Sequence, residues 1–212
     1  MSATAAQEGP RPMLDETPSP ELVPAVRIAR PALPDAEKLM LTSLDIGLAT
    51  VAARLSPAGR AAVQAQFGAY LGKASHPVLV SNRFVDFVCP LCFPALALHE
   101  ARCEMAHLSV AHYQQTILGR VMLAPMRLMG LERVLRQAPK QFAATTNYGT
   151  RWVADLGPRH WRFDCEDELM HPETMWGSLE AVAQMVGVRD VRVVFSLLAP
   201  GHYSYDITWG QP

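Results

Sequence analysis

The chain has 212 residues, of which 50% are hydrophobic and 18% charged, and its net charge is −1. A chain of this length and composition can bury a hydrophobic core, which excludes a protein that is disordered throughout. The near-zero charge excludes nucleic-acid binding through bulk electrostatics. There is no uninterrupted apolar run long enough to predict a membrane span, and the N-terminus lacks the features of a signal peptide, which favours the cytoplasm.

The sequence divides into a proline-rich flexible tail over residues 1–36 and a single domain over residues 37–212. Seven of the 17 prolines fall in the first segment, where they remove backbone donors and disfavour both helix and strand pairing. Its one apolar patch, at residues 22–28, is suited to docking on a partner or on the body of the protein, although the composition of the segment as a whole favours a solvated tail. We therefore expect a solvated tail whose apolar residues are incidental, with docking as the alternative.

The first part of the domain, residues 37–140, has the composition of helices punctuated by loops. We expect helices over 36–55, 58–71, 95–129 and 131–137. Ser56 and Pro57 are suited to start the second of these, Pro125 to kink the third, and Pro139 to close the fourth. An irregular stretch carrying the two cysteines at positions 89 and 92 separates the second helix from the third.

From residue 147 the apolar period changes from 3.6 to 2. Residues 151–156 and 160–166 alternate across a Gly-Pro turn and predict a hairpin. A helix starting at Pro172 and a second hairpin over 191–198 and 203–209 follow. The sequence therefore predicts an α+β fold, with an N-terminal helical layer packed on a small antiparallel sheet of order strand-strand-helix-strand-strand.

Several separated blocks of the sequence resemble a known family. They are LGRVMLA at 118–124, VLRQAP at 134–139, TNYG at 146–149, GSLE at 177–180 and YSYDITW at 203–209. Together they resemble a paralogous family of unknown function that is expanded in myxobacteria. That family is similar, more distantly, to small-ligand-binding domains of the vinyl-reductase and trafficking-particle type. The resemblance implies one α+β domain with a sensory or scaffolding role and dimerisation, and it carries over no catalytic residues.

One cluster of residue types points to a metal. Cys89 and Cys92 form a C-x-x-C, which supplies two of the four ligands of a zinc site or a redox dithiol. His99, Cys103 and His107 follow at intervals of four and share one helical stripe. No second motif completes the set, so the alternatives are buried structural thiols and a polar helix face.

A second set of residues points to an apolar ligand. Met105, Met122 and Met126 belong to a methionine-rich helical segment, and methionine adapts to irregular apolar surfaces. Together with Trp176 they are the residues we expect to line a cavity between the helices and the sheet. Core packing is the alternative for all four. The acidic run at 164–171 lacks the spacing of a calcium loop and predicts a solvated loop instead.

No nucleophile elbow, phosphate loop, dinucleotide fingerprint or zinc-protease helix occurs in the sequence. Our main hypothesis is therefore a non-enzymatic signalling or scaffold module that binds a protein partner, as a homodimer or larger homo-oligomer. The first alternative is a sensor of a small apolar ligand, and the second is a metal- or thiol-dependent protein. The sequence identifies no particular cofactor, and it favours neither nucleic acid nor a membrane as a partner.

Overall fold

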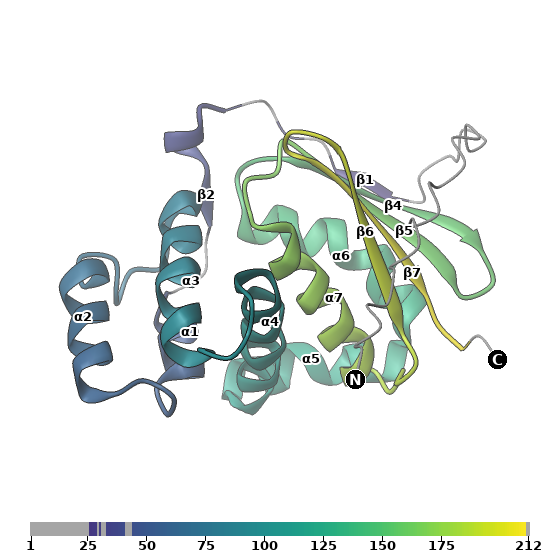
Figure 1. Cartoon of the computed structure of the whole chain (residues 1–212). Coiled ribbons are helices and arrows are strands. Elements are labelled where there is room, and N and C mark those ends of the chain that lie inside the picture. Colours follow the sequence, from purple (N-terminus) through teal and green to yellow (C-terminus); the bar gives the residue numbers. More distant parts are fainter. Residues whose placement is uncertain (1–25, 29, 31–32, 41–43, 211–212) are drawn as a thin grey trace, which may run out of the picture.

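Residues 26–28, 30, 33–40 and 44–210 are described by the structure, a computed structural model of the whole chain (Figure 1). The α-helices are α1 (Leu44–Val51), α2 (Pro57–Phe67), α3 (Val78–Cys92), α4 (Leu98–Gln115), α5 (Ile117–Met129), α6 (Leu131–Thr145) and α7 (Pro172–Met185). The main sheet consists of β1 (Val26–Ile28), β4 (Thr150–Gly157), β5 (His160–Glu166), β6 (Arg192–Ala199) and β7 (His202–Thr208). A second, two-stranded sheet pairs β2 (Leu39–Met40) with β3 (His76–Pro77). The α+β fold predicted from the sequence, with helices first and α7 between two hairpins, is confirmed.

The main sheet is antiparallel and has the strand order β1-β4-β5-β7-β6. Both hairpins predicted from the alternating pattern are present, as β4–β5 and β6–β7. The inner face carries Trp161, Phe163, Tyr205 and Ile207, each at most 1% exposed. Side chains of alternate residues therefore form one apolar face, which α6 and α7 cover.

The buried side chains fall into two clusters, one on each side of the contact between α4 and α7. The sheet core lies mainly between the inner face of the sheet, α6 and α7, and α7 adds Met175 and Leu179 to it. The helical core lies among α1, α2, α3 and α4, and α4 adds Ala101 and Met105. Figure 1 shows α4 between the α1–α3 group and α7. The line along which α4 packs on α7, here called the seam, therefore joins the two cores.

Local capping signals explain where two helices begin. The Ser56 hydroxyl accepts a hydrogen bond from the Gly59 N–H (3.0 Å), with Pro57 as the first helical residue of α2, as predicted. Pro172 likewise occupies the first turn of α7. Among the described residues, every helix is too short or too polar to cross a membrane.

Several sequence-based predictions of helix boundaries are wrong. The single helix expected over 95–129 is two helices, α4 and α5, which meet at Thr116, the residue that caps the start of α5. Residues 36–55 are helical mainly over Leu44–Val51, because the Asn147 side chain accepts a hydrogen bond from the Leu39 N–H (2.7 Å) and holds that stretch extended as β2. The C-x-x-C lies inside α3 rather than in an irregular stretch. The helix expected to close at Pro139, α6, continues through this residue to Thr145, and the burial of the proline ring offsets the lost backbone hydrogen bond.

Most of the predicted tail, residues 1–25, 29, 31 and 32, lies outside the described residues. Strand pairing, which the prolines disfavour, nevertheless occurs at Val26–Ile28, which pairs with β4 at one edge of the sheet. The Arg27 guanidinium stacks 4.8 Å from the centre of the Trp152 ring on the neighbouring strand. The described part of the apolar patch, Val26–Ile28, therefore docks on the body of the protein, which was one of the two docking alternatives.

Candidate functional site

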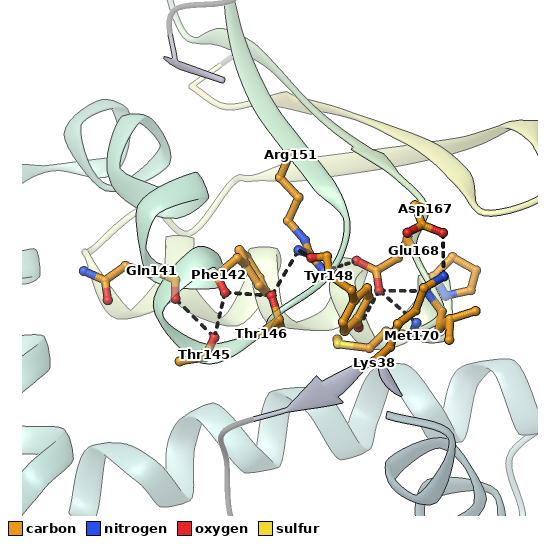
Figure 2. A network of polar contacts seen from close by, with 12 residues as sticks. Lys38, Gln141, Phe142, Thr145, Thr146, Tyr148, Arg151, Asp167, Glu168 and Met170 are labelled. Atoms are coloured by element: carbon orange, nitrogen blue, oxygen red, sulfur yellow. Dashed lines mark hydrogen bonds and ion pairs between the residues drawn. The ribbon is translucent and has the colours of Figure 1, made fainter. Parts of the chain in front are cut away.

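A buried carboxylate, Glu168, organises the loop between β5 and α7 (Figure 2). Its side chain is 1% exposed and accepts four hydrogen bonds. The donors are the Tyr148 hydroxyl (2.9 Å), the Arg151 guanidinium (2.5 Å) and the backbone N–H groups of Leu169 and Met170 (3.0 and 2.9 Å). All of the carboxylate's strong partners therefore come from the chain itself.

The partner cation, Arg151, is as deeply buried as the carboxylate. Burial alone would lower its pKa, but the charge of Glu168 reverses this effect and raises the pKa above its usual range. The guanidinium also donates to the Thr146 hydroxyl (3.3 Å) and the Tyr148 carbonyl (3.1 Å). The start of β4 is thus attached to the end of β5 by a charged pair in a water-poor environment.

The loop 167–170 also binds segments that are distant in sequence. The Lys38 ammonium, 3% exposed, lies 2.5 Å from the Asp167 carboxylate. The Asn82 side chain on α3 donates to the Leu169 carbonyl (2.6 Å). This loop therefore connects the N-terminal segment, the helical core and the sheet.

The prediction that the acidic run at 164–171 is solvated is wrong for Asp164, which is buried, and for Glu168 at the centre of this cluster. The signal that would have found Glu168 is the hairpin itself. Thr150 lies opposite Glu166 in the β4–β5 register, so residues just before β4 meet residues just after β5. Tyr148 lies just before β4, Arg151 lies at its start, and Glu168 lies just after the end of β5. Once the register of the two strands is known, these three residues are expected to meet.

A second polar cluster lies on the seam. The ligand-type atoms of Cys103, His107 and Glu180 all lie within 4.8 Å of one another. His107 Nε2 is 3.1 Å from Glu180 Oε2. Hydrogen bonds with Cys103 and Glu180 raise the pKa of His107 to about 9, which indicates a polar cluster stabilised by mutual contacts.

Two helices hold this cluster through i, i+4 spacing. Cys103 and His107 are one turn apart on α4, and Trp176 and Glu180 are one turn apart on α7. The Trp176 indole N–H donates to Glu180 Oε1 (2.8 Å) and fixes the carboxylate. An open groove of about 460 Å³ adjoins the cluster. Its lining consists of Glu104, His107, Leu108, Val110, Ala111, Gln114, Ala181, Gln184 and Met185.

The structure brings together only part of the metal set expected from the sequence. Among the described residues, the group of His, Cys, Asp and Glu within ligand distance contains Cys103 and His107, adds Glu180, and leaves out the other three residues. Cys89 and Cys92 are buried in the helical core, where burial raises the pKa of the Cys89 thiol to about 12. His99 lies exposed in the first turn of α4.

The residues expected to line an apolar cavity are also separated. Met105 is buried in the helical core, and Met126 is half-buried on α5. The side chain of Met122 lies outside the described part of the chain. Trp176 packs on Phe195 of β6 and binds Glu180, so it belongs to the seam. Sequence reasoning therefore identified two members of the seam cluster, Cys103 and His107, and missed Glu180 on the partner helix.

Comparison with solved structures shows that the fold is similar to that of H-NOX proteins. An iron(II) unliganded H-NOX protein from K. algicida, a point mutant, superposes with a TM-score of 0.60 and 6% identity over 81% of this chain and 97% of its own. An H-NOX protein from a study of H-NOX activation superposes with a TM-score of 0.57 and 10% identity, over 79% of this chain and 94% of its own. A protein studied for heme redox potential and porphyrin distortion superposes with a TM-score of 0.55 and 9% identity, over 80% of this chain and 94% of its own.

The chain belongs to a family described as "Protein of unknown function (DUF2378)", whose model matches residues 46–210. This agrees with the family of unknown function that the sequence resembles. No curated protein matches the sequence.

Iron and heme are named for two of these structural neighbours, but the described residues here do not fit a heme between helices and sheet. Heme iron takes His, Cys, Met or Tyr as its axial ligand. α6 adds Leu131 and Leu135 to the sheet core, with Ala138 and Phe142 packed against it, and none of these four residues ligates iron. Tyr148, Trp161 and Phe163 belong to the same core, each at most 1% exposed, and the Tyr148 hydroxyl already donates to Glu168. Within the described residues, that region is a packed core rather than a slot.

Proposed function

We propose that this chain is a non-catalytic sensor module in which a small ligand, bound in the groove on the seam, changes how the helical core and the sheet core sit together. The observation that carries the proposal is the position of the groove. It is lined by α4, which belongs to one core, and by α7, which belongs to the other.

The groove has the mixed lining that small-ligand sites use. Leu108, Val110 and Ala111 from α4 face Ala181 and Met185 from α7, which gives an apolar surface on both walls. Polar groups from both helices, among them the histidine of the seam cluster, supply directional contacts. A ligand that contacts both walls favours one spacing of the helices, which is the condition for shifting a two-state equilibrium.

The loop 167–170 offers a second connection between the cores. It precedes α7 directly, and it is held by Asn82 from α3 and by Lys38 from the N-terminal segment. A displacement of α7 along the seam must therefore be accommodated at this loop. The H-NOX likeness supports a sensor through the fold, as does the distant resemblance to small-ligand-binding domains, and the filled core points to a ligand other than heme.

Filling the groove should abolish ligand binding. We expect Ala111→Trp, at an exposed position on the groove wall, to prevent binding because the indole occupies the ligand's volume. Ala65→Trp on the exposed side of α2 is the matched control. The measurement is native mass spectrometry of the full chain after incubation with a protein-free small-molecule extract of the cells that make it. Wild type and Ala65→Trp should retain an added mass that Ala111→Trp loses.

Hydrogen exchange on the loaded and stripped wild-type chain tests whether the signal is transmitted. Slower exchange should reach β5 and β7 as well as α4 and α7. No added mass on wild type, or an added mass that Ala111→Trp keeps, contradicts the assignment of the groove. Slowing confined to the groove contradicts the sensor role.

A protein-binding role, our main hypothesis from the sequence, is supported by the free edge of the sheet. β6 pairs only with β7 in the described sheet, and it exposes Val194, Leu197 and Leu198 by 41%, 62% and 57%. Apolar side chains on an unpaired edge favour the addition of a further strand. We propose a second copy of this chain as the occupant, since antiparallel pairing of identical edges is self-complementary.

Charge on this edge should then separate the copies. We expect the full chain to have a dimer mass by light scattering after size exclusion, and Leu197→Glu combined with Leu198→Lys to have a monomer mass. Leu128→Glu on α5, where the leucine is 90% exposed, is the control and should stay dimeric. A monomeric wild type, or a double variant that remains a dimer, contradicts this role.

A further inference from the structure

The geometry points to a divalent transition-metal site on the seam: we infer that Cys103, His107 and Glu180 bind Zn²⁺, with a fourth position open toward the groove. Only one part of this inference rests on the sensor role proposed above, namely that the open position of the ion faces a ligand bound in the groove. The site itself is defined by the three side chains.

The spacing of the ligand atoms suits a tetrahedral ion. In a tetrahedral zinc site with sulfur, nitrogen and oxygen ligands, neighbouring donor atoms lie roughly 3.3–3.6 Å apart. His107 Nε2 and Glu180 Oε2 are already 3.1 Å apart, and all three atoms lie within 4.8 Å of one another. Small rotamer adjustments at Cys103 therefore complete the site without movement of either helix.

The donor set selects the class of ion. A thiolate and an imidazole favour Zn²⁺ over Mg²⁺ or Ca²⁺, which prefer oxygen ligands. A deprotonated Cys103 and the Glu180 carboxylate together carry two negative charges, which neutralise a divalent cation. The ion leaves water when it enters this half-buried site. A site whose total charge is then zero offsets most of the cost of desolvating the ion.

The surroundings of the three ligands match those of an accessible metal site. The Trp176 indole N–H binds the oxygen of Glu180 that does not face His107, and it orients the carboxylate in the way that outer-shell partners orient metal ligands. The side chains of His107 and Glu180 are 24% and 22% exposed, so an ion can enter. Three protein ligands and an open position are the arrangement of zinc sites that bind a further small molecule.

The test is a metal titration of the reduced, chelator-treated full chain. We expect one Zn²⁺ per chain in competition with a chromophoric chelator, and a thiolate-to-metal charge-transfer band when Co²⁺ is used instead. Cys103→Ser and His107→Ala should weaken Zn²⁺ binding more than about 100-fold, since the loss of an outer-shell partner alone costs about 10–100-fold. Trp176→Phe should weaken it about 10-fold. Glu180→Gln, which preserves shape, serves as the third ligand variant if Cys103→Ser fails to fold.

His99→Ala is the matched control, because this histidine is on the same helix but outside the cluster. It should bind Zn²⁺ as wild type does. Wild-type affinity in Cys103→Ser or Glu180→Gln, or a Co²⁺ spectrum without a thiolate band, overturns the site. Zn²⁺ binding without slower exchange in β5 and β7 supports the metal site and contradicts the sensor role. An organic ligand bound in the groove, in a chain that does not bind Zn²⁺, supports the sensor role and contradicts the metal site.

Discussion

Replacing Glu168 with alanine should lower the free energy of unfolding by about 3–5 kcal/mol, the cost of removing one partner from a buried ion pair. The Arg151 guanidinium, 3% exposed, would keep its charge without a counter-ion. The Tyr148 hydroxyl and the two backbone N–H groups that follow Glu168 would lose their acceptor as well. Domains of this size are stable by only about 5–15 kcal/mol, so this change removes a large share of the total.

Urea unfolding of the full chain, followed by circular dichroism, measures this loss. Glu166→Ala is the matched control, because Glu166 is two residues away and forms an exposed pair with Arg27 at 3.4 Å. Such pairs contribute about 0–1 kcal/mol. Glu168→Ala should therefore unfold at a much lower urea concentration than Glu166→Ala. Equal midpoints for the two variants would show that the buried carboxylate is not stabilised as described.

A double replacement separates the charge from the packing. Glu168→Leu combined with Arg151→Met removes both charges while keeping apolar volume. It should recover part of the stability that Glu168→Ala loses, because an apolar pair carries no desolvation cost. If the double variant is as unstable as Glu168→Ala, the hydrogen bonds of Glu168 to the loop backbone, and not the buried charge, account for the loss.

The sequence was sufficient to predict elements whose pattern is local. The period-2 alternation in β5 and β7 and the Ser56-Pro57 start of α2 each depend on residues within one turn or one strand, and the structure confirms them. The extended segment at Leu39 was not predictable in this way. Its helical composition is overridden by a hydrogen bond to Asn147, which lies more than 100 residues further along the chain.

The candidate site shows the same division between local and distant information. Cys103 and His107 are one turn apart on one helix, so their spacing alone placed them on one stripe. Glu180 is 73 residues from His107, and it joins them only because α7 packs along α4. That packing depends on Gly177 of α7, which lies directly against the backbone of α4 at Cys103. A search of the sequence for chemically reactive side chains does not consider glycine.

Adding a single methyl group at Gly177 should destabilise the protein by about 1–3 kcal/mol through overpacking. A Cβ at this position would lie 2.4 Å from the backbone carbonyl oxygen of Cys103 and 3.0 Å from the Ala106 Cβ. The first contact is with backbone, so α7 must move away from α4 as a unit. The cost of this movement exceeds the gain of about 1 kcal/mol that alanine brings over glycine inside a helix.

Gly59→Ala in α2 is the control with the opposite expected sign. There the added Cβ meets two side chains and no backbone: Leu55 at 3.3 Å, which can rotate away, and the Ser56 hydroxyl at 3.4 Å, which is at ordinary contact distance. Its helix propensity should therefore make Gly59→Ala neutral or slightly more stable in the same urea experiment. Gly177→Ala with a stability equal to or above wild type would show that the two helices do not approach as closely as described.

The same substitution connects the stability of the seam with its chemistry. Gly177 lies between Trp176 and Glu180 on α7 and directly against Cys103 on α4, so a displacement of α7 separates the Glu180 carboxylate from the Cys103 thiol. Zn²⁺ affinity in Gly177→Ala should therefore fall about 10-fold or more, the size of an outer-shell effect, while His107 and Cys103 stay in place on α4. Gly59→Ala should leave that affinity unchanged. If Gly177→Ala loses stability but binds Zn²⁺ as tightly as wild type, the ion does not need Glu180, and the bridge between the two helices is not part of the site.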